Sequence, residues 1–366
     1  MKCVGAQLCL ILCLIEVYKL CVLMNVFAMS SRVKTAKREP PSSWRESMRA
    51  PPSSWRESMR APPPLMNAPK IPMNNTMGGG RPTLGRRARA QWATNRLSDI
   101  ISNLSRAKFQ SEEIEDLIAN DGADPNVQGD MGKGFTLLFK LSMMGRTEVE
   151  GVVHDNILKT FTFLLERRDV DVNISHLGAV LAIHHVVDMR DPAFLHLLLE
   201  KRPEAILGIN ALSGPNGEGE APLHCACRDP MVPLENIRML LAHGADPNMK
   251  CGESLMTPLQ YLMVAYAGRD VDRINKLIAI INEFFKNPQT RLGDPTLVDK
   301  YGRTLLHYAA RNVRSEEVCD MLLRRGEYKS IKIGCSKGVT PLQEAMRQNN
   351  TGAFDAMVGF RRVLGG

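Results

Sequence analysis

The stretch GRTLLHYA, from Gly302 to Ala309, decides which fold this sequence predicts. The phrase contains a glycine, a threonine, two leucines and a histidine, and it ends on an alanine. Five related phrases occur elsewhere in the chain. These are GFTLLFKL (Gly134–Leu141), GAVLAIHH (Gly178–His185), GEAPLHCA (Gly219–Ala226), LMTPLQYL (Leu255–Leu262) and GVTPLQEA (Gly338–Ala345). The positions equivalent to Thr304 are 136, 180, 221, 257, 304 and 340, so successive phrases lie 36 to 47 residues apart. Self-similarity at such a period indicates a repeat array.

Each phrase is typical of the start of a helix. Thr257 and Thr340 are expected N-caps, and the proline after each occupies the first helical position, where a missing N–H costs nothing. Apolar runs such as NIRMLLAHGADPN follow and predict a second helix. A glycine in the left-handed conformation is expected to end that helix, at Gly122, Gly244 and Gly326. The sequence therefore predicts helix–turn–helix units.

The recurring T-P-L-H-x-A and G-A-D-P-N phrases make the chain resemble the ankyrin repeat family, over about Ser111 to Phe360. The resemblance implies about six stretched repeats in an all-α solenoid, each a helix–turn–helix unit with a short β-turn hairpin. Only Gly302–Gly326 follows the family pattern throughout. The predicted ankyrin-repeat domain spans 93–366, and repeat boundaries within 134–218 stay open.

The phrase GEAPLHCACRDP (Gly219–Pro230) places His224, Cys225 and Cys227 within four residues, like metal ligands. A closed zinc site needs four ligands, and Cys251 is the only nearby candidate. The two cysteines align with positions that hold Tyr and Ala in another repeat, and the resemblance implies a turn-stabilising hydrogen bond for the histidine. We expect structural packing, with no metal and no cofactor.

Enzyme motifs are missing from the sequence. No H-E-x-x-H, G-x-S-x-G or C-x-x-C pattern occurs. We therefore expect no catalytic residues and no enzymatic activity.

Basic charge is confined to the N-terminal part. Between Ser31 and Ala90, thirteen Lys and Arg face three Glu, a net charge of +10, whereas the whole chain carries +8. Residues 1–30 add +1, so a net charge of −3 remains for the part from Gln91 onward, which argues against nucleic-acid binding by the folded domain.

Residues 30–92 are predicted to be a disordered, basic linker rich in Pro, Arg and Ser. Within it, PPSSWRESMRA occurs twice in tandem, at Pro40–Ala50 and Pro51–Ala61. Trp44 and Trp55 make each copy a candidate linear motif, and an in-frame duplication of unconstrained sequence is the other interpretation.

Residues 1–29 are mostly apolar and have three interpretations: a secretory signal, a membrane anchor, or sequence upstream of the true translation start. Contact with a membrane is expected only if residues 3–28 are retained. We expect a cytoplasmic or nuclear protein; use of the apolar segment would make it a membrane or secreted one.

A solenoid offers a long concave face and a row of hairpin tips, and the resemblance implies that another protein binds there. The function predicted is that of a non-catalytic scaffold or adaptor. A substrate-recruiting subunit of an enzyme complex, such as a ligase adaptor, is the alternative, as is a membrane-tethered or secreted ankyrin protein. The candidate contact residues are Gln128, Asp130, Lys133, Lys250, Glu253, Lys300, Tyr301, Arg303 and Lys337.

Overall fold

The structure is a computed structural model that describes residues 85–104, 109–129, 135–144, 151–176, 179–214, 217 and 219–363. All of them belong to one compact unit that begins at Gly80. The apolar segment 1–29, the duplicated motif with Trp44 and Trp55, and the linker up to residue 84 lie outside the described residues.

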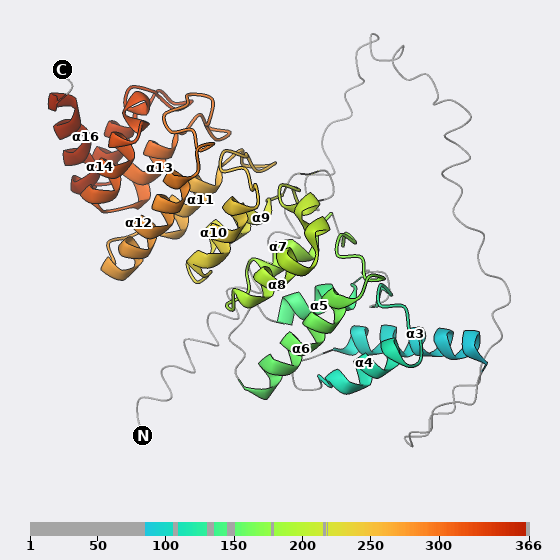
Figure 1. The fold of residues 1–366 in the computed structure, drawn as a ribbon. Helices are drawn as coiled ribbons and strands as arrows, with labels where there is room; N and C mark the ends of the chain where they lie inside the picture. The colour runs from blue at the N-terminus through green and yellow to red at the C-terminus, as the bar shows by residue number, and fades with distance from the viewer. Residues whose placement is uncertain are drawn as a thin grey trace, which may run out of the picture. The chain divides into compact units, whose positions relative to one another are not determined.

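Within the described residues the helices come in pairs (Figure 1). The first pair is α3 (Arg86–Asn103) and α4 (Ser111–Ala119). The pairs that follow are α5 (Leu137–Met144) with α6 (Val152–Glu166), α7 (Ala182–Val186) with α8 (Ala193–Lys201), α9 (Pro222–Arg228) with α10 (Leu234–Ala242), α11 (Pro258–Ala265) with α12 (Val271–Lys286), α13 (Leu305–Asn312) with α14 (Glu316–Arg324), and α15 (Pro341–Arg347) with α16 (Thr351–Val363). Two 3₁₀ helices, η4 (Pro203–Gly208) and η5 (Glu327–Ser330), follow α8 and α14.

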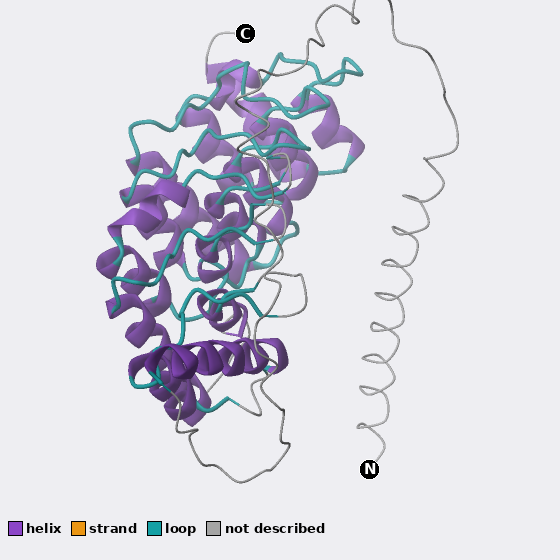
Figure 2. Ribbon diagram, turned by 90° about the vertical axis from the view of Figure 1, so that its right-hand side faces the viewer, coloured by secondary structure: helices purple, strands orange, loops and turns teal. Residues whose placement is uncertain are grey.

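The pairs stack in chain order. The first helices contact one another in the series α5, α7, α9, α11, α13 and α15, and form an inner row. The second helices form an outer row, in which α4, α6, α8, α10 and α12 follow one another and α14 packs on α16. The loops gather along one side of this stack (Figure 2). The described residues contain isolated β-bridges but no strand, which confirms the predicted all-α solenoid.

The inner helices α9, α13 and α15 each carry an alanine at the centre, which lets neighbouring inner helices approach closely. Ala226, Ala309 and Ala345 are at most 1% exposed. The outer helices fill the core with larger side chains, among them Phe161, Phe194 and Phe284. This alternation of small and large residues lets the two rows of helices pack closely against each other.

Local capping fixes where the helices start and stop. The Thr257 hydroxyl accepts a hydrogen bond from the Gln260 N–H at 3.4 Å, and the Gln260 side chain accepts one from the Thr257 N–H at 2.9 Å. Thr340 and Gln343 form the same reciprocal pair, and a proline follows each threonine at the start of its helix. The predicted left-handed glycines are also confirmed, with φ of 75°, 91° and 130° at Gly122, Gly244 and Gly326.

Two boundaries differ from those expected. Helix α3 begins at Arg86, whereas residues 86–92 were assigned to the linker; Ala93, Leu97 and Ile101, spaced by one helical turn, are fully buried and hold the whole helix on the stack. In the second repeat the N-cap is Leu181, one residue after position 180. Val180 instead exchanges backbone hydrogen bonds of 2.8 and 2.9 Å with His176 in the preceding hairpin.

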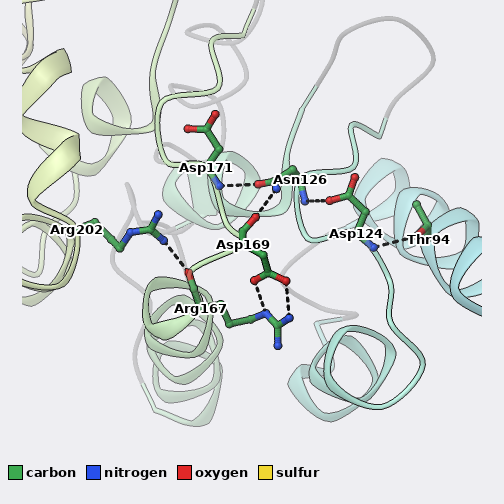
Figure 3. A network of polar contacts seen from close by, with 7 residues as sticks. All are labelled: Thr94, Asp124, Asn126, Arg167, Asp169, Asp171 and Arg202. Atoms are coloured by element: carbon green, nitrogen blue, oxygen red, sulfur yellow. Dashed lines mark hydrogen bonds and ion pairs between the residues drawn. The ribbon is translucent and has the colours of Figure 1, made fainter.

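The turns that follow the outer helices are joined by asparagine side chains (Figure 3). Asp124 accepts a hydrogen bond from the Asn126 N–H at 2.9 Å, which closes the local turn. The Asn126 amide then reaches the next turn along the stack: its oxygen accepts from the Asp171 N–H at 2.7 Å, and its nitrogen donates to the Asp169 carbonyl at 2.6 Å.

The same bridge recurs further along the stack. Asn248 accepts from the Arg291 N–H at 2.8 Å and donates to the Gln289 carbonyl at 2.7 Å. Asn210 accepts from the Asp246 N–H at 2.8 Å. Because each amide serves backbone groups of the following turn, these asparagines fix the spacing of consecutive repeats.

No helix within the described residues combines the length and apolar character that a membrane-spanning segment requires.

Candidate partner-binding surface

Three backbone hydrogen bonds join four consecutive hairpins into one edge, which we call the hairpin row. The Gly252 N–H donates to the Gly219 carbonyl at 3.0 Å, the Lys300 N–H to the Ser254 carbonyl at 3.1 Å, and the Ser336 N–H to the Tyr301 carbonyl at 2.8 Å. Bonds of this kind restrain loops that otherwise move independently. The row therefore presents its side chains from a fixed backbone.

The hairpin between Asp299 and Arg303 shows how a tip is held. Asp299 is 4% exposed, and one of its carboxylate oxygens accepts from the N–H groups of Tyr301 and Arg303, each at 2.8 Å. The other oxygen accepts from the Tyr308 hydroxyl on α13 at 2.7 Å. Burial, together with that carboxylate, raises the pKa of Tyr308, so its hydroxyl remains a donor. The tip is thereby attached to the inner helix beneath it.

Tyr301 is the aromatic side chain that this tip displays. It is 48% exposed, and its ring lies 4.9 Å from the Arg303 guanidinium carbon and 5.4 Å from the Lys300 ammonium nitrogen. Both distances are within the range of cation–π attraction. An exposed tyrosine of this kind is a residue type that is enriched at protein-interface hot spots.

The structure brings most of the predicted contact residues into the hairpin row. Lys250 and Glu253 lie on the hairpin before Lys300, Tyr301 and Arg303, and Lys337 lies on the hairpin after them; each is exposed or half-buried. Gln128 is exposed but sits at the other end of the stack, where its carbonyl accepts from the Ser98 hydroxyl at 3.2 Å. Asp130 and Lys133 lie outside the described residues.

Buried side chains on the inner helices position each hairpin. His184, His224 and His307 bond through Nε2 to the carbonyls of Ala211, Met256 and Val339, at 2.9, 3.0 and 2.8 Å. Burial lowers the pKa of all three imidazoles, which favours the neutral form with Nε2–H as the donor. Gln260 takes the same place in its repeat and donates to the Arg303 carbonyl at 3.1 Å. The predicted turn-stabilising role of the histidine position is confirmed.

The cysteines beside His224 behave as core residues. Cys225 and Cys227 are 6% and 0% exposed on α9, and burial raises the pKa of both thiols. A zinc ligand has to be a thiolate, which this environment disfavours. The Cys251 sulfur instead contacts the Ser254 hydroxyl at 2.7 Å. Across the described ranges, no three His, Cys, Asp or Glu side chains are grouped to hold a metal ion.

Sequence reasoning missed Leu255, which lies on the hairpin between Cys251 and Met256. It has a φ of 56° and is 40% exposed. Glycine and asparagine are the usual residues in this left-handed region, so the sequence carries no signal for it. Two further exposed apolar side chains, Val264 and Met346, lie on α11 and α15 and are 47% and 59% exposed.

These helix pairs, hairpins and cross-repeat bonds define the class of the protein, a solenoid of stacked helical repeats. Ankyrin repeat family models match residues 218–251 and 301–329. The chain therefore contains ankyrin repeats in these two segments. No curated protein matches the sequence.

Two solved structures that match this chain are distant from it in sequence. The ankyrin repeat domain of Bcl-3, a member of the IkappaB protein family, shares 16% identity with a TM-score of 0.50; the match covers 72% of this chain and 97% of that one. A chain in the structure of the Bd0816 predatory endopeptidase from Bdellovibrio bacteriovorus, in complex with immunity protein Bd3460, shares 17% identity with a TM-score of 0.41. That match covers 61% of this chain and 96% of the other. At 16% identity, the likeness to the Bcl-3 domain indicates a shared fold alone.

Proposed function

We propose that this protein is a non-catalytic scaffold that binds a partner protein through its hairpin row and the adjoining inner helices. Ankyrin repeats in general are protein-interaction modules, and repeat arrays provide extended binding surfaces. The observation that carries the proposal is the set of three backbone bonds between hairpins, because they hold four hairpins, three of which display exposed side chains, in one fixed arrangement.

A fixed arrangement favours binding for an energetic reason. Loops that become ordered only on association lose conformational entropy, which subtracts from affinity. In this row, Asp299 and the histidine-position side chains have already ordered the loops. The exposed Tyr301 then offers the type of residue that contributes most to protein interfaces.

The buried histidines of the inner helices are better suited to a structural role than to catalysis. The imidazoles of His184, His224 and His307 are at most 3% exposed, and each donates to a main-chain carbonyl of the next hairpin. A general base has to reach a substrate proton. These rings are instead used to position the hairpins.

The test compares three forms of the full chain as bait in a lysate of the source organism: the unaltered protein, Tyr301→Ala/Lys250→Ala, and a control, Lys201→Ala/Lys286→Ala. The control removes two lysines from the outer helices α8 and α12. Proteins captured by the unaltered and control baits but lost by the Tyr301→Ala/Lys250→Ala bait are the expected result. Identical captures by all three baits would contradict the proposal.

A further inference from the structure

The hairpin row contains one residue whose conformation does not suit its type. Leu255 has a φ of 56°, a region that the Cβ of a leucine makes unfavourable, and its side chain is 40% exposed. The Leu255 N–H is satisfied by the Cys251 carbonyl at 3.1 Å, so the turn is well formed. A strained residue kept with an apolar side chain in solvent is typical of a functional position.

Leu255 belongs to the hairpin beside Tyr301. The Ser254 carbonyl, one residue earlier, accepts from the Lys300 N–H, and Lys300 directly precedes Tyr301. Neighbouring hairpins of the row thus display two apolar side chains, 40% and 48% exposed. Scattered apolar residues are ordinary on surfaces, but a pair on a rigid edge is suited to anchoring a partner.

The charges around this pair are mainly positive. Lys300 and Lys337 are exposed, and Arg303 is half-buried with its guanidinium over the Tyr301 ring. Of the carboxylates in these hairpins, Asp299 is buried and committed to backbone N–H groups and Tyr308. Glu253 is exposed, on the same hairpin as Lys250. An acidic partner segment would meet available cations here and few competing carboxylates.

We propose that Leu255, Tyr301, Lys300, Arg303 and Lys337 together bind an acidic peptide segment of another protein, with apolar side chains of that segment on Leu255 and Tyr301. This inference rests on the function proposed above and names the chemistry of its partner. Electrostatic complementarity supplies orientation and association rate, and the apolar pair supplies the desolvated contact.

A nucleic acid is the less favoured occupant of this surface. From Gln91 onward the chain carries a net charge close to −3, whereas nucleic-acid-binding domains are usually basic as a whole. Of the two exposed side chains, only Tyr301 has a ring on which a base could stack, whereas single-strand binding surfaces stack successive bases on several rings.

The test selects random dodecapeptides displayed on phage against the full chain. Parallel selections use Leu255→Asn, in which asparagine tolerates the left-handed turn, and Lys300→Glu/Lys337→Glu. A matched control, Lys201→Glu/Lys286→Glu, makes the same change of charge on the outer helices. Every bait carries the same basic N-terminal part, so only differences between baits report on the hairpin row.

The expected peptides are enriched by the unaltered and control baits, are lost by both hairpin-row variants, and contain an excess of Asp and Glu with apolar residues among them. One such peptide is then synthesised and labelled. Its Kd for each hairpin-row variant is expected to be at least about tenfold higher than its Kd for the unaltered chain. We call peptides that both hairpin-row variants lose row-dependent peptides. The inference would be overturned if these peptides were neutral or basic, or if there were none. Binding of single-stranded oligouridylate that depends on the same residues would also overturn it, because it would assign the surface to nucleic acid.

Failure here is distinguishable from failure of the proposed function. If the Tyr301→Ala/Lys250→Ala bait loses a lysate partner and the row-dependent peptides are not acidic, the scaffold function is supported and the acidic partner is rejected. Equal capture by every bait rejects the scaffold function itself.

Discussion

Replacing Asn248 with alanine removes one complete bridge between consecutive turns. The side chain is 8% exposed, accepts from the Arg291 N–H at 2.8 Å and donates to the Gln289 carbonyl at 2.7 Å. Alanine reproduces neither bond. Both backbone groups are then left without the partner that the fold provides.

The expected loss follows from these two bonds. A buried polar group that loses its partner costs about 1–3 kcal/mol. Because Arg291 is exposed, water reaches part of this turn. We therefore assign the Arg291 N–H and the Gln289 carbonyl each a cost in the lower half of that range. The free energy of unfolding is expected to fall by about 3 kcal/mol.

The assay is urea unfolding of the full chain at 25 °C, followed by circular dichroism at 222 nm. The control is Asn282→Ala, at an exposed position on α12, which should change the free energy of unfolding by less than about 0.5 kcal/mol. A loss for Asn248→Ala as small as that of the control would refute the view that these amides fix the spacing of the repeats.

Three other outcomes are expected from the same structure. Leu255→Gly should change the free energy of unfolding by less than about 1 kcal/mol, because relief of the left-handed strain offsets the lost contacts. By contrast, Leu259→Ala, at a site that is 4% exposed, should lower the free energy of unfolding by about 2–5 kcal/mol. Urea titrations of both variants check this. Stability should fall as the pH drops below the ordinary histidine pKa of 6.5, because the unfolded chain then binds protons that the buried imidazoles of His184, His224 and His307, with their lowered pKa values, do not bind. Melting temperatures of the whole chain from pH 7.5 to 5 check this. Burial raises the pKa of Cys319 to about 12, so its thiol should react with Ellman's reagent only after unfolding, as peptide mapping of the labelled sites would reveal.

The repeat phrases predict the helices well because their signals are local. A threonine N-cap, a following proline and a C-terminal glycine act within one turn of helix, so Thr257, Thr340 and Gly244 were assigned correctly from the sequence alone. The second repeat lacks both threonine and proline. Without those signals its register was predicted one residue early, and only the His176–Val180 hairpin places the N-cap at Leu181.

Contacts between repeats were less accessible to sequence reasoning. The ADPN phrase indicates a turn, but nothing in its composition shows that Asn126 and Asn248 bond to turns more than forty residues later. The same holds for the candidate surface. The tips around Tyr301 were predicted from their place in the repeat, whereas Leu255 is found only from its backbone conformation and exposure.

The central claim is that the hairpin row contacts a partner protein, and site-specific photocrosslinking tests it most directly. Benzoylphenylalanine is placed in the full chain at position 301, at position 337, or at position 286 on the outer helix α12, and the chain is irradiated in lysate of the source organism. The account predicts one crosslinked partner shared by positions 301 and 337 and absent from position 286. Crosslinks confined to position 286, or the same products from all three positions, would contradict it.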